Sequence, residues 1–266
     1  MTLVVFSVDT ERDSSHSIAG KPLEATTFGK NEPSFSATEK GLEDLLSLLK
    51  ELEIPATFFF EAQTALVLDK KMNLKKLFAG HEIGFHGFNH EDFAGIKTGV
   101  KVGEAKRGEI LSEGKKVLEK VFDRKIPGFR APYLSADDGL MEIARKHFAY
   151  DSSLYGAKTV VFKGFPRIPV FEGTGAKGRK TQGFLWALME GERTAGDYVD
   201  LVKQGIKQKS SPIVLATHSW HTRMTRKNGR LSEEQAKEKI GQVRMVLEGL
   251  KALPGVEFTT LQKCLY

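Results

Sequence analysis

The chain of 266 residues has a single cysteine, Cys264, and no long hydrophobic run. One cysteine excludes an internal disulfide and a cysteine-based zinc site. Apolar runs such as Leu3–Phe6 and Ala56–Phe60 are short, and the longest, Phe184–Met189, has six residues, whereas a membrane helix needs about 20. We therefore expect neither a disulfide framework nor a membrane span.

A strong excess of one charge is also lacking. Lys and Arg total 40 against 34 Asp and Glu, which gives a net charge of +6, and the signs alternate along the chain. No nucleic-acid-binding module accompanies this mild excess, so we expect a solvated surface and no nucleic-acid partner. The residues after Met1 contain no charged region, long apolar stretch or cleavage site of a secretion signal, which predicts a cytoplasmic protein.

Short β-rich runs alternate with segments of helical periodicity along the chain. Strands are expected at Leu3–Val8, Ala56–Phe60, Glu82–Phe85, Gly128–Arg130, Ile213–Thr217 and Val256–Phe258. Helix starts, marked by a Ser or Thr with an acid or Gln three residues later, are expected at Ser36, Ser135, Thr194 and Ser232. Such alternation predicts an α/β fold in which helices cover a parallel sheet.

The length and the alternation suit a barrel. We predict one domain over residues 1–266, an irregular or incompletely closed TIM-like (β/α)7 barrel with about seven parallel strands and helices outside. Residues 12–34 and 163–183 lack strong periodicity. Connections this long inside a compact domain are usually functional loops, so we expect them to influence the choice of substrate.

Two histidines, His86 and His90, follow the strand expected at Glu82–Phe85. Histidines four residues apart can share one metal ion, although such a pair can equally be structural. Their position past the carboxyl end of a strand favours a site, because parallel α/β proteins bind ligands there.

Asp9 and Glu11 end the first expected strand. Carboxylates at positions i and i+2 can point into the same opening, where they could supply one metal ligand and one base. Two histidines and one carboxylate, with open positions left over, suit a catalytic divalent metal.

Two later strand ends carry further candidates. Arg130 could hold a carboxylate through two hydrogen bonds or could form a surface salt bridge, and Pro132 fixes the turn that follows. His218 could act as a general acid or could make an ordinary polar contact.

These stretches, in this order, resemble the polysaccharide deacetylase family, the NodB-homology enzymes of carbohydrate esterase family 4. The resemblance spans roughly residues 3–221 and is carried by Ala56–Phe60, Gly80–His90, Gly128–Tyr133 and Asp151–Tyr155. It implies metal ligation by His86 and His90, orientation of the catalytic aspartate by Arg130, an oxyanion contact from the backbone N–H of Tyr133, and tuning of His218 by Asp151.

The first motif departs from the family pattern. The family typically has two adjacent aspartates, a base followed by a metal ligand, whereas here Thr10 separates Asp9 from Glu11. Members with Asp-x-Glu resemble this sequence more closely, and in them the second acid is the ligand. We therefore assign Asp9 as base and Glu11 as ligand, with the reverse assignment and Asp13 as ligand left open.

The resemblance implies a metal-dependent amide hydrolase, an N-deacetylase of a small or lipid-linked N-acetylated amino sugar. A deformylase, a cyclic-ureide amidohydrolase and a non-catalytic carbohydrate-binding barrel are the alternatives. Zinc is the expected metal, although the same ligands accept cobalt, nickel or iron. Tyr155, Trp220 and His221 are expected to contact the substrate, and Arg223, Arg226, Lys227 and Arg230 could hold a phosphate or carboxylate of it.

Overall fold

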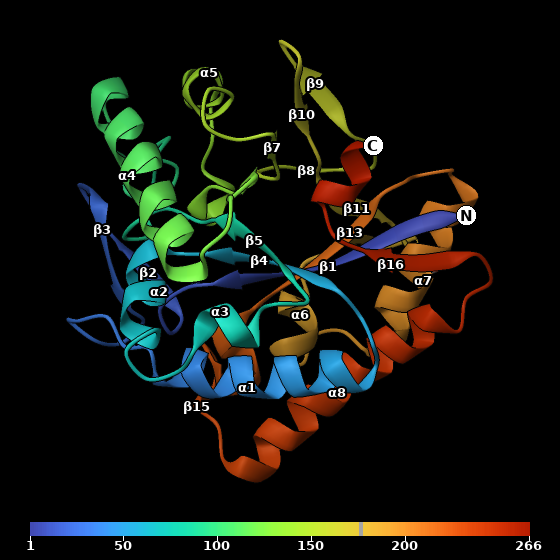
Figure 1. Cartoon of the computed structure of the whole chain (residues 1–266). Coiled ribbons are helices and arrows are strands. Elements are labelled where there is room, and N and C mark those ends of the chain that lie inside the picture. Colours follow the sequence, from blue (N-terminus) through green and yellow to red (C-terminus); the bar gives the residue numbers. More distant parts are fainter. Residues whose placement is uncertain (176–177) are drawn as a thin grey trace.

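The computed structural model describes residues 1–175 and 178–266, and its centre is the strand β1 (Thr2–Thr10). β13 (Ile213–His218) pairs with one edge of β1. The other edge pairs with β16 (Val256–Thr259) over its first half and with β4 (Ala56–Phe60) over its second half. All of these pairings are parallel (Figure 1). β1 is apolar on both faces because helices and the barrel interior cover both sides of such a strand.

The sheet continues beyond β4 through three shorter parallel strands. β5 (Glu82–Phe85), β6 (Gly128–Phe129) and β7 (Tyr150–Asp151) follow in spatial order. β10 (Phe165–Arg167) then runs parallel to β7, and β9 (Val160–Phe162) forms an antiparallel hairpin with it. The successive parallel pairings place the carboxyl ends of β1, β4, β5 and β6 along one edge.

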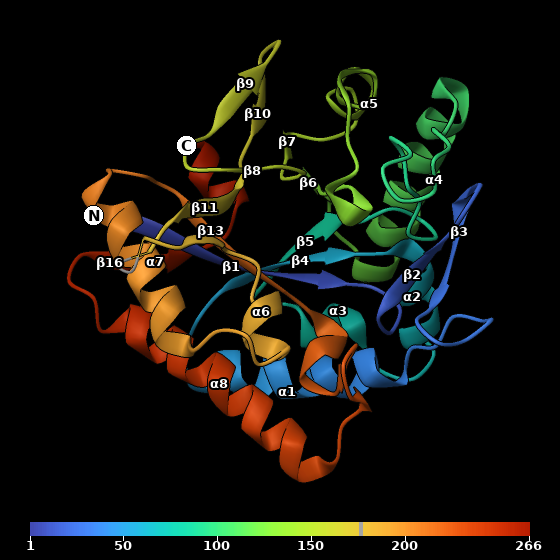
Figure 2. The ribbon, with the colours of Figure 1, turned by 180° about the vertical axis from the view of Figure 1, so that it is seen from behind.

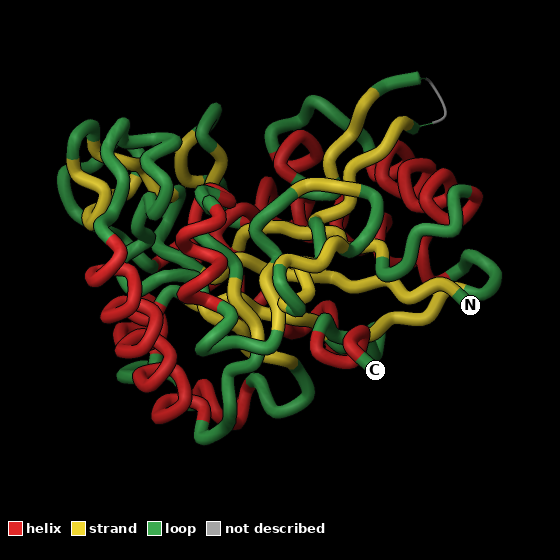
Figure 3. Tube along the Cα trace, turned by 90° about the horizontal axis from the view of Figure 1, so that it is seen from above, coloured by secondary structure: helices red, strands yellow, loops and turns green. Residues whose placement is uncertain are grey.

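A small second sheet lies between β13 and the strands at the other end of the main sheet, β7, β10 and β9. β11 (Val170–Thr174) pairs with β8 (Tyr155–Gly156) and β12 (Lys180–Gln182). Beside it, Phe184 forms a parallel bridge with Ala216 of β13. The curled sheet is therefore an incompletely closed barrel, and the predicted irregular (β/α)7 architecture is confirmed (Figures 2 and 3).

Helices lie outside the sheet, with α1 and α8 side by side below it in Figure 1. The described helices are α1 (Ser36–Glu51), α2 (Ala62–Leu68), α3 (Leu74–Leu77), α4 (Glu104–Phe122), α5 (Asp138–Ala144), α6 (Trp186–Met189), α7 (Ala195–Lys207) and α8 (Glu233–Lys251). Short 3-10 turns are η1 (Pro132–Leu134), η2 (Ser219–Thr222) and η3 (Gln262–Leu265). Among the described residues, no helix is both long and apolar enough to span a membrane.

The predicted helix starts have mixed outcomes. The capping boxes at Thr194 and Ser232 are confirmed, each with both reciprocal hydrogen bonds. The start at Ser135 is wrong, because Asp137 caps α5 and the Ser135 hydroxyl instead donates to Asp92.

The predicted capping box at Ser36 is also wrong. The first amides of α1 donate to the carboxylate of Asp13, from Ala37 over 3.1 Å and from Thr38 over 2.8 Å. A full negative charge satisfies these otherwise unpaired amides better than a hydroxyl does. Asp13 therefore anchors α1 and lies outside the cluster of metal-ligand candidates.

Both long connections contain strands of their own. Residues 12–34 include the hairpin of β2 (Ser15–Ile18) and β3 (Lys21–Thr27). Residues 163–183 include β10, β11 and β12, and residues 176–177 of this connection lie outside the described residues. A further hairpin joins β14 (Met224–Thr225) and β15 (Gly229–Arg230) after η2. Residues of both long connections line the main cavity, as expected of functional loops.

Candidate metal centre and catalytic site

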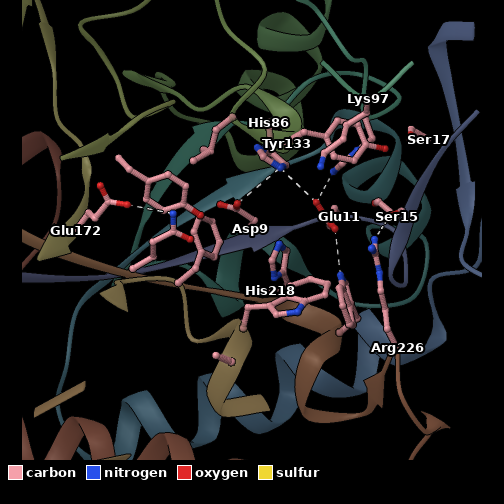
Figure 4. A pocket seen from close by; sticks show the side chains of 18 of the residues that line it. Asp9, Glu11, Ser15, Ser17, His86, Lys97, Tyr133, Glu172, His218 and Arg226 are labelled. Carbon is pink, nitrogen blue, oxygen red and sulfur yellow. Dashed lines mark hydrogen bonds and ion pairs between the residues drawn. The ribbon is translucent and has the colours of Figure 1, made fainter. Parts of the chain in front are cut away.

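The ends of three strands bring the candidate residues together (Figure 4). Asp9 lies near the end of β1 and is paired in register with His218 at the end of β13. Glu11 follows β1, and His86 follows β5 directly. These strands are parallel, so their carboxyl ends meet at one edge, where ligand sites of such folds lie.

Glu11, His86 and His90 form a buried cluster suited to a metal ion. One Glu11 oxygen lies 2.5 Å from Nε2 of His90 and 3.3 Å from Nε2 of His86. One ligand atom of each residue lies within 4.8 Å of the others, and each residue is at most 3% exposed. One carboxylate oxygen and two imidazole nitrogens are typical ligands of zinc and related divalent metals.

The surroundings of the cluster support metal ligation. Nδ1 of His86 lies 2.8 Å from the Arg130 carbonyl oxygen, which directs the proton to Nδ1 and leaves Nε2 as a lone-pair donor. The indole N–H of Trp220 donates to the second Glu11 oxygen over 3.1 Å. Burial would raise the pKa of Glu11, but His90 and the hydrogen bonds to His86 and His90 outweigh it and hold that pKa well below the usual range. Glu11 is therefore oriented and ionised, as a ligand must be.

Asp9 is held by Arg130 beside the cluster. Arg130 donates from Nη1 to one Asp9 oxygen over 2.7 Å, and the other Asp9 oxygen lies 3.8 Å from Nε2 of His86. Arg130 is fully buried, so the alternative of a surface salt bridge is wrong. Its remaining donors bind Ser7 and Ser152, and its guanidinium lies 4.2 Å from the Phe59 ring centroid. These contacts fix the carboxylate that Arg130 presents.

The turn after Arg130 has an uncommon backbone conformation. Tyr133 and Leu134 have φ values of 57° and 53°, in the left-handed region that non-glycine residues rarely adopt. Each such residue costs about 1–2 kcal/mol and is retained only where its surroundings impose it. The turn places the Tyr133 ring 4.4 Å from that of His90. Tyr133 therefore lines the cavity beside the metal-ligand cluster.

His218, at the end of β13, is half-buried and lies among aromatic rings. Phe184 and Trp220 stack on it at 5.2 Å and 5.3 Å between centroids. Burial lowers its pKa, against the opposing charges of Glu11 and Asp9. Its Nδ1 atom has no hydrogen-bond partner among the described residues.

The expected pairing of Asp151 with His218 is wrong. Asp151 accepts hydrogen bonds from Nε of Arg167 over 2.8 Å and from the N–H and hydroxyl of Ser153. It ends β7, which the sheet order separates from β13 by β6, β5, β4 and β1. The carboxylate therefore organises the loop after β7 rather than the charge of His218.

Of the three residues expected to contact the substrate, two line the cavity and one does not. Tyr155 lines the cavity and is 37% exposed. Trp220 lines it too, but its N–H is engaged with Glu11. His221 is fully buried, does not line the cavity, and places Nε2 3.0 Å from Glu190, so its assignment as a substrate contact is wrong. The His221–Glu190 pair supports the β14–β15 hairpin that follows and does not face the cavity.

The site opens into a cavity of about 810 Å³. Its deep end holds Asp9, Glu11, His86, His90 and His218. Nearer the opening it is lined mostly by polar and charged side chains, among them Ser15, His16, Ser17, Lys97, Glu172, Lys180, Gln182, Arg193 and Arg226. A volume of this size accommodates a small organic molecule or the end of a larger one.

Several contributing residues were not predicted. Glu61 accepts the backbone N–H of Arg12 over 2.9 Å and its Nε over 3.0 Å, which fixes the chain directly after Glu11. Glu61 follows the strand Ala56–Phe60, and an acid at that position was an available signal. Ser7 and Ser152, which bind Arg130, carry no such signal because serines are common in strands and loops.

The fold and the site define a class of protein, an incompletely closed α/β barrel with a buried two-histidine, one-carboxylate centre. The family model described as polysaccharide deacetylase matches residues 24–149, a little less than half of the chain. The resemblance seen in the motifs is thus confirmed, and the chain is related to the polysaccharide deacetylases. The matched segment contains His86, His90 and Arg130 but neither Asp9 nor His218, whose place in the site rests on the structure.

Individual proteins are also similar to this chain in sequence or in fold. A peptidoglycan deacetylase of Helicobacter pylori is 28% identical over 119 residues, which make up 44% of this chain and 38% of that protein. A solved Mycobacterium smegmatis protein assigned as a polysaccharide deacetylase has a TM-score of 0.66 at 20% identity, covering 98% of this chain and 87% of its own. Puue allantoinase has a TM-score of 0.64 at 15% identity, covering 98% and 88%. These structural similarities show a shared fold.

Proposed function

We propose that the chain is a metal-dependent amide hydrolase that removes an N-acetyl group from an amino sugar. The observation that carries this proposal is the buried Glu11, His86 and His90 cluster, beside an aspartate held by Arg130, at the base of an open cavity. Metal ligands, a separate carboxylate and room for a substrate are the parts that amide hydrolysis at neutral pH requires.

The proton transfers are assigned from the geometry. A divalent metal bound here would polarise the amide carbonyl and acidify the attacking water. Asp9 is the base, because Arg130 holds one of its carboxylate oxygens and its other oxygen faces the cluster. The Glu11 carboxylate, engaged by two histidines and Trp220, has no oxygen left for this task.

His218 is the proposed acid on the other side of the scissile bond. An amine leaves only when it is protonated, and His218 lines the same cavity, with Asp9 between it and His86 in Figure 4. The backbone N–H of Tyr133 is proposed to stabilise the oxyanion, since its turn lies beside His90 at the edge of the cavity.

Zinc is the proposed metal, because neutral imidazoles and one carboxylate suit it, and cobalt, nickel and iron are the competitors. Elemental analysis of protein purified without added metal tests this. About one zinc per chain is expected. A content near zero that added zinc, cobalt, nickel or iron cannot raise would contradict the metal site altogether.

The substrate is tested by acetate release. Free N-acetylated amino sugars and sugars linked to a lipid carrier through phosphate would be assayed with the metal-loaded protein, together with N-formyl sugars and cyclic ureides. Acetate from either sugar class supports the proposal. Formate release or ureide opening without acetate release would replace it with the alternative amide chemistry, and no hydrolysis of any of them would reject it.

We further propose that the reaction takes place inside the cell. Cys264 is a free thiol, a state that a reducing compartment maintains. Fractionation of cells that express the native gene would test the location, and recovery of the protein outside the cytoplasm would contradict it.

A further inference from the structure

The cavity carries positive charge that nearby residues do not neutralise. The cavity is lined by Lys97, Lys180, Arg193 and Arg226. Lys180 pairs with Glu172 at 3.0 Å. Within residues 1–175 and 178–266, no ion pair joins a carboxylate to Lys97, Arg193 or Arg226. The two deep carboxylates cannot serve them, because Asp9 is bound to Arg130 and Glu11 to the histidines.

Arg226 is the best oriented of these cations. Its Nη2 donates to the Ser15 carbonyl oxygen over 2.9 Å, and its Nε lies 3.4 Å from the Ser14 hydroxyl. Its guanidinium lies 5.0 Å from the Trp186 ring centroid and 5.5 Å from that of Phe28. Nη1 makes no hydrogen bond with a described residue. An arginine held in this way keeps free donors and loses little side-chain entropy when an anion binds.

The backbone that carries Arg226 is fixed as well. Glu190 accepts the N–H of Arg226 over 2.9 Å and that of Lys227 over 3.2 Å, and it also binds His221. The buried His221–Glu190 pair thus holds the segment that presents Arg226 to the cavity. This gives His221 a structural purpose that the sequence did not indicate.

The other basic residues of this segment face elsewhere. Arg223 forms ion pairs with Asp44 and Glu233, and Arg230 donates to the Ser36 hydroxyl. Neither they nor Lys227 line the cavity. Of the basic cluster that the sequence offered as an anion site, the structure selects Arg226.

We propose that Arg226 binds an anionic oxygen group, a phosphate or a carboxylate, on the acylated sugar that this site accepts. The inference rests on the proposed function and narrows its substrate class to charged amino sugars. Arginine suits this task because its planar donors match two oxygens of such a group. Lys97 and Arg193 add positive potential to the same cavity.

Arg226 also ties the β2–β3 hairpin to the segment after η2, so a purely structural role must be separated from binding. The test is titration calorimetry of the metal-loaded protein with three ligands: N-acetylglucosamine, its 1-phosphate, and N-acetylmuramic acid, which carries a carboxylate. Arg226→Gln is compared with wild type, and Arg230→Gln serves as the matched control from the same segment.

We expect wild type to prefer at least one charged sugar over the neutral one. Arg226→Gln should reduce this preference by about 10-fold to 100-fold, the size expected for a lost hydrogen bond to a charged group. Arg226→Lys should restore part of it, and the wild-type preference should weaken as salt is added. Loss of preference for the phosphate alone, or for the carboxylate alone, identifies which group is bound.

An unchanged preference in Arg226→Gln would overturn the inference, and so would an equal loss of affinity for the neutral and charged sugars. The outcome is independent of turnover. A charge preference without amide hydrolysis would reject the proposed function and support the anion site. Acetate release with no charge preference would support the proposed function and reject the anion site.

Discussion

The deep end of the cavity and its rim are built on different principles. Asp9, Glu11, His86 and Arg130 are at most 3% exposed, and each makes two or more polar contacts with the others or with neighbouring residues. At the rim, Tyr155 is 37% exposed, and Lys97, Lys180 and Arg226 are exposed. Residues at the deep end come from strand ends, and those at the rim come mainly from connecting segments.

We therefore expect the deep end to carry out the reaction and the rim to select the substrate. At the deep end, removing one partner leaves another buried charge unpaired, which is costly. At the rim, water can solvate whatever a substitution exposes, so changes there alter which ligand binds at little cost in stability. The substitutions below test this contrast, beginning with those that should have the largest effect.

His86→Ala should have the largest effect. It removes one of the proposed metal ligands, so metal affinity should fall by more than the roughly 100-fold seen when only a supporting residue is lost. Elemental analysis after dialysis should find almost no metal, and activity should disappear. His147→Ala, which changes a histidine outside the cavity, is the control. Retention of a full metal complement by His86→Ala would remove it from the ligand set.

Asp9→Asn and His218→Ala should come next. Each should lower the turnover rate by about 10²-fold to 10⁴-fold, the usual contribution of a positioned acid or base, while the metal content stays near that of wild type. Steady-state kinetics and elemental analysis on the same preparations measure both quantities.

The same series can reassign the roles. If Asp9→Asn loses the metal and Glu11→Gln keeps it, the base and the ligand are exchanged. If His221→Ala loses more turnover than His218→Ala, the acid is not His218.

Trp220→Phe should have an intermediate effect. It removes the N–H that donates to Glu11 but keeps an aromatic ring in the buried position. Metal affinity should fall by about 10-fold, the lower end of the range for such supporting contacts. Competition with a chelator would measure it. Trp186→Phe is the control, since Trp186 makes no hydrogen bond to Glu11, and equal affinities for the two variants would contradict the role of Trp220.

Acidification should gradually lower the free energy of unfolding through His221 and Glu190, the pair that supports the rim. Burial lowers the pKa of His221 to about 4, despite the opposing hydrogen bond to Glu190. Between pH 6.5 and about 4 the unfolded chain therefore binds a proton that the folded chain does not, and the free energy of unfolding falls as pH falls. The pKa of Glu190 is lowered to about 2, because the His221 hydrogen bond and the Arg226 N–H outweigh its burial. The stabilisation that ionised Glu190 gives the folded chain is likewise lost as the pH falls below about 4.5.

Through His221, acidification should lower the free energy of unfolding by up to about 3 kcal/mol, at about 1.4 kcal/mol per pKa unit. Urea unfolding at several pH values between 7 and 4.5 would measure it. His221→Gln keeps a donor for Glu190 but cannot titrate, so its stability should fall less over this range. Equal pH dependence in the variant and in wild type would contradict the neutral state of His221.

The positions of most central strands and the candidate site residues could be predicted from the sequence because their signals are local. The strands Ala56–Phe60 and Glu82–Phe85 match the structure residue for residue, since short apolar β-branched and aromatic runs have few alternatives. Asp9, Glu11, His86 and His218 could be placed at one edge because parallel strands share the direction of their carboxyl ends.

The errors have the opposite cause. Ser36 has a capping pattern, but Asp13, 24 residues before Ala37, reaches α1 first. Asp151 has the motif position of a partner for His218, but Arg167 and Ser153 take its oxygens. For Ser36, and for Asp151 through Arg167, the electrostatic partner comes from elsewhere in the chain, and local sequence spacing contains no record of it.

By itself, the sequence determined the alternation of strands and helices and the residues able to ligate a metal, because both follow from side-chain type and near-neighbour spacing. The tertiary structure alone decided that Trp220 holds Glu11, that His221 supports the rim through Glu190, and that Arg226 is the basic residue of its segment that lines the cavity. These outcomes depend on which groups meet after the sheet curls, and buried polar groups bind the nearest partner that satisfies them, however far away it lies in the chain.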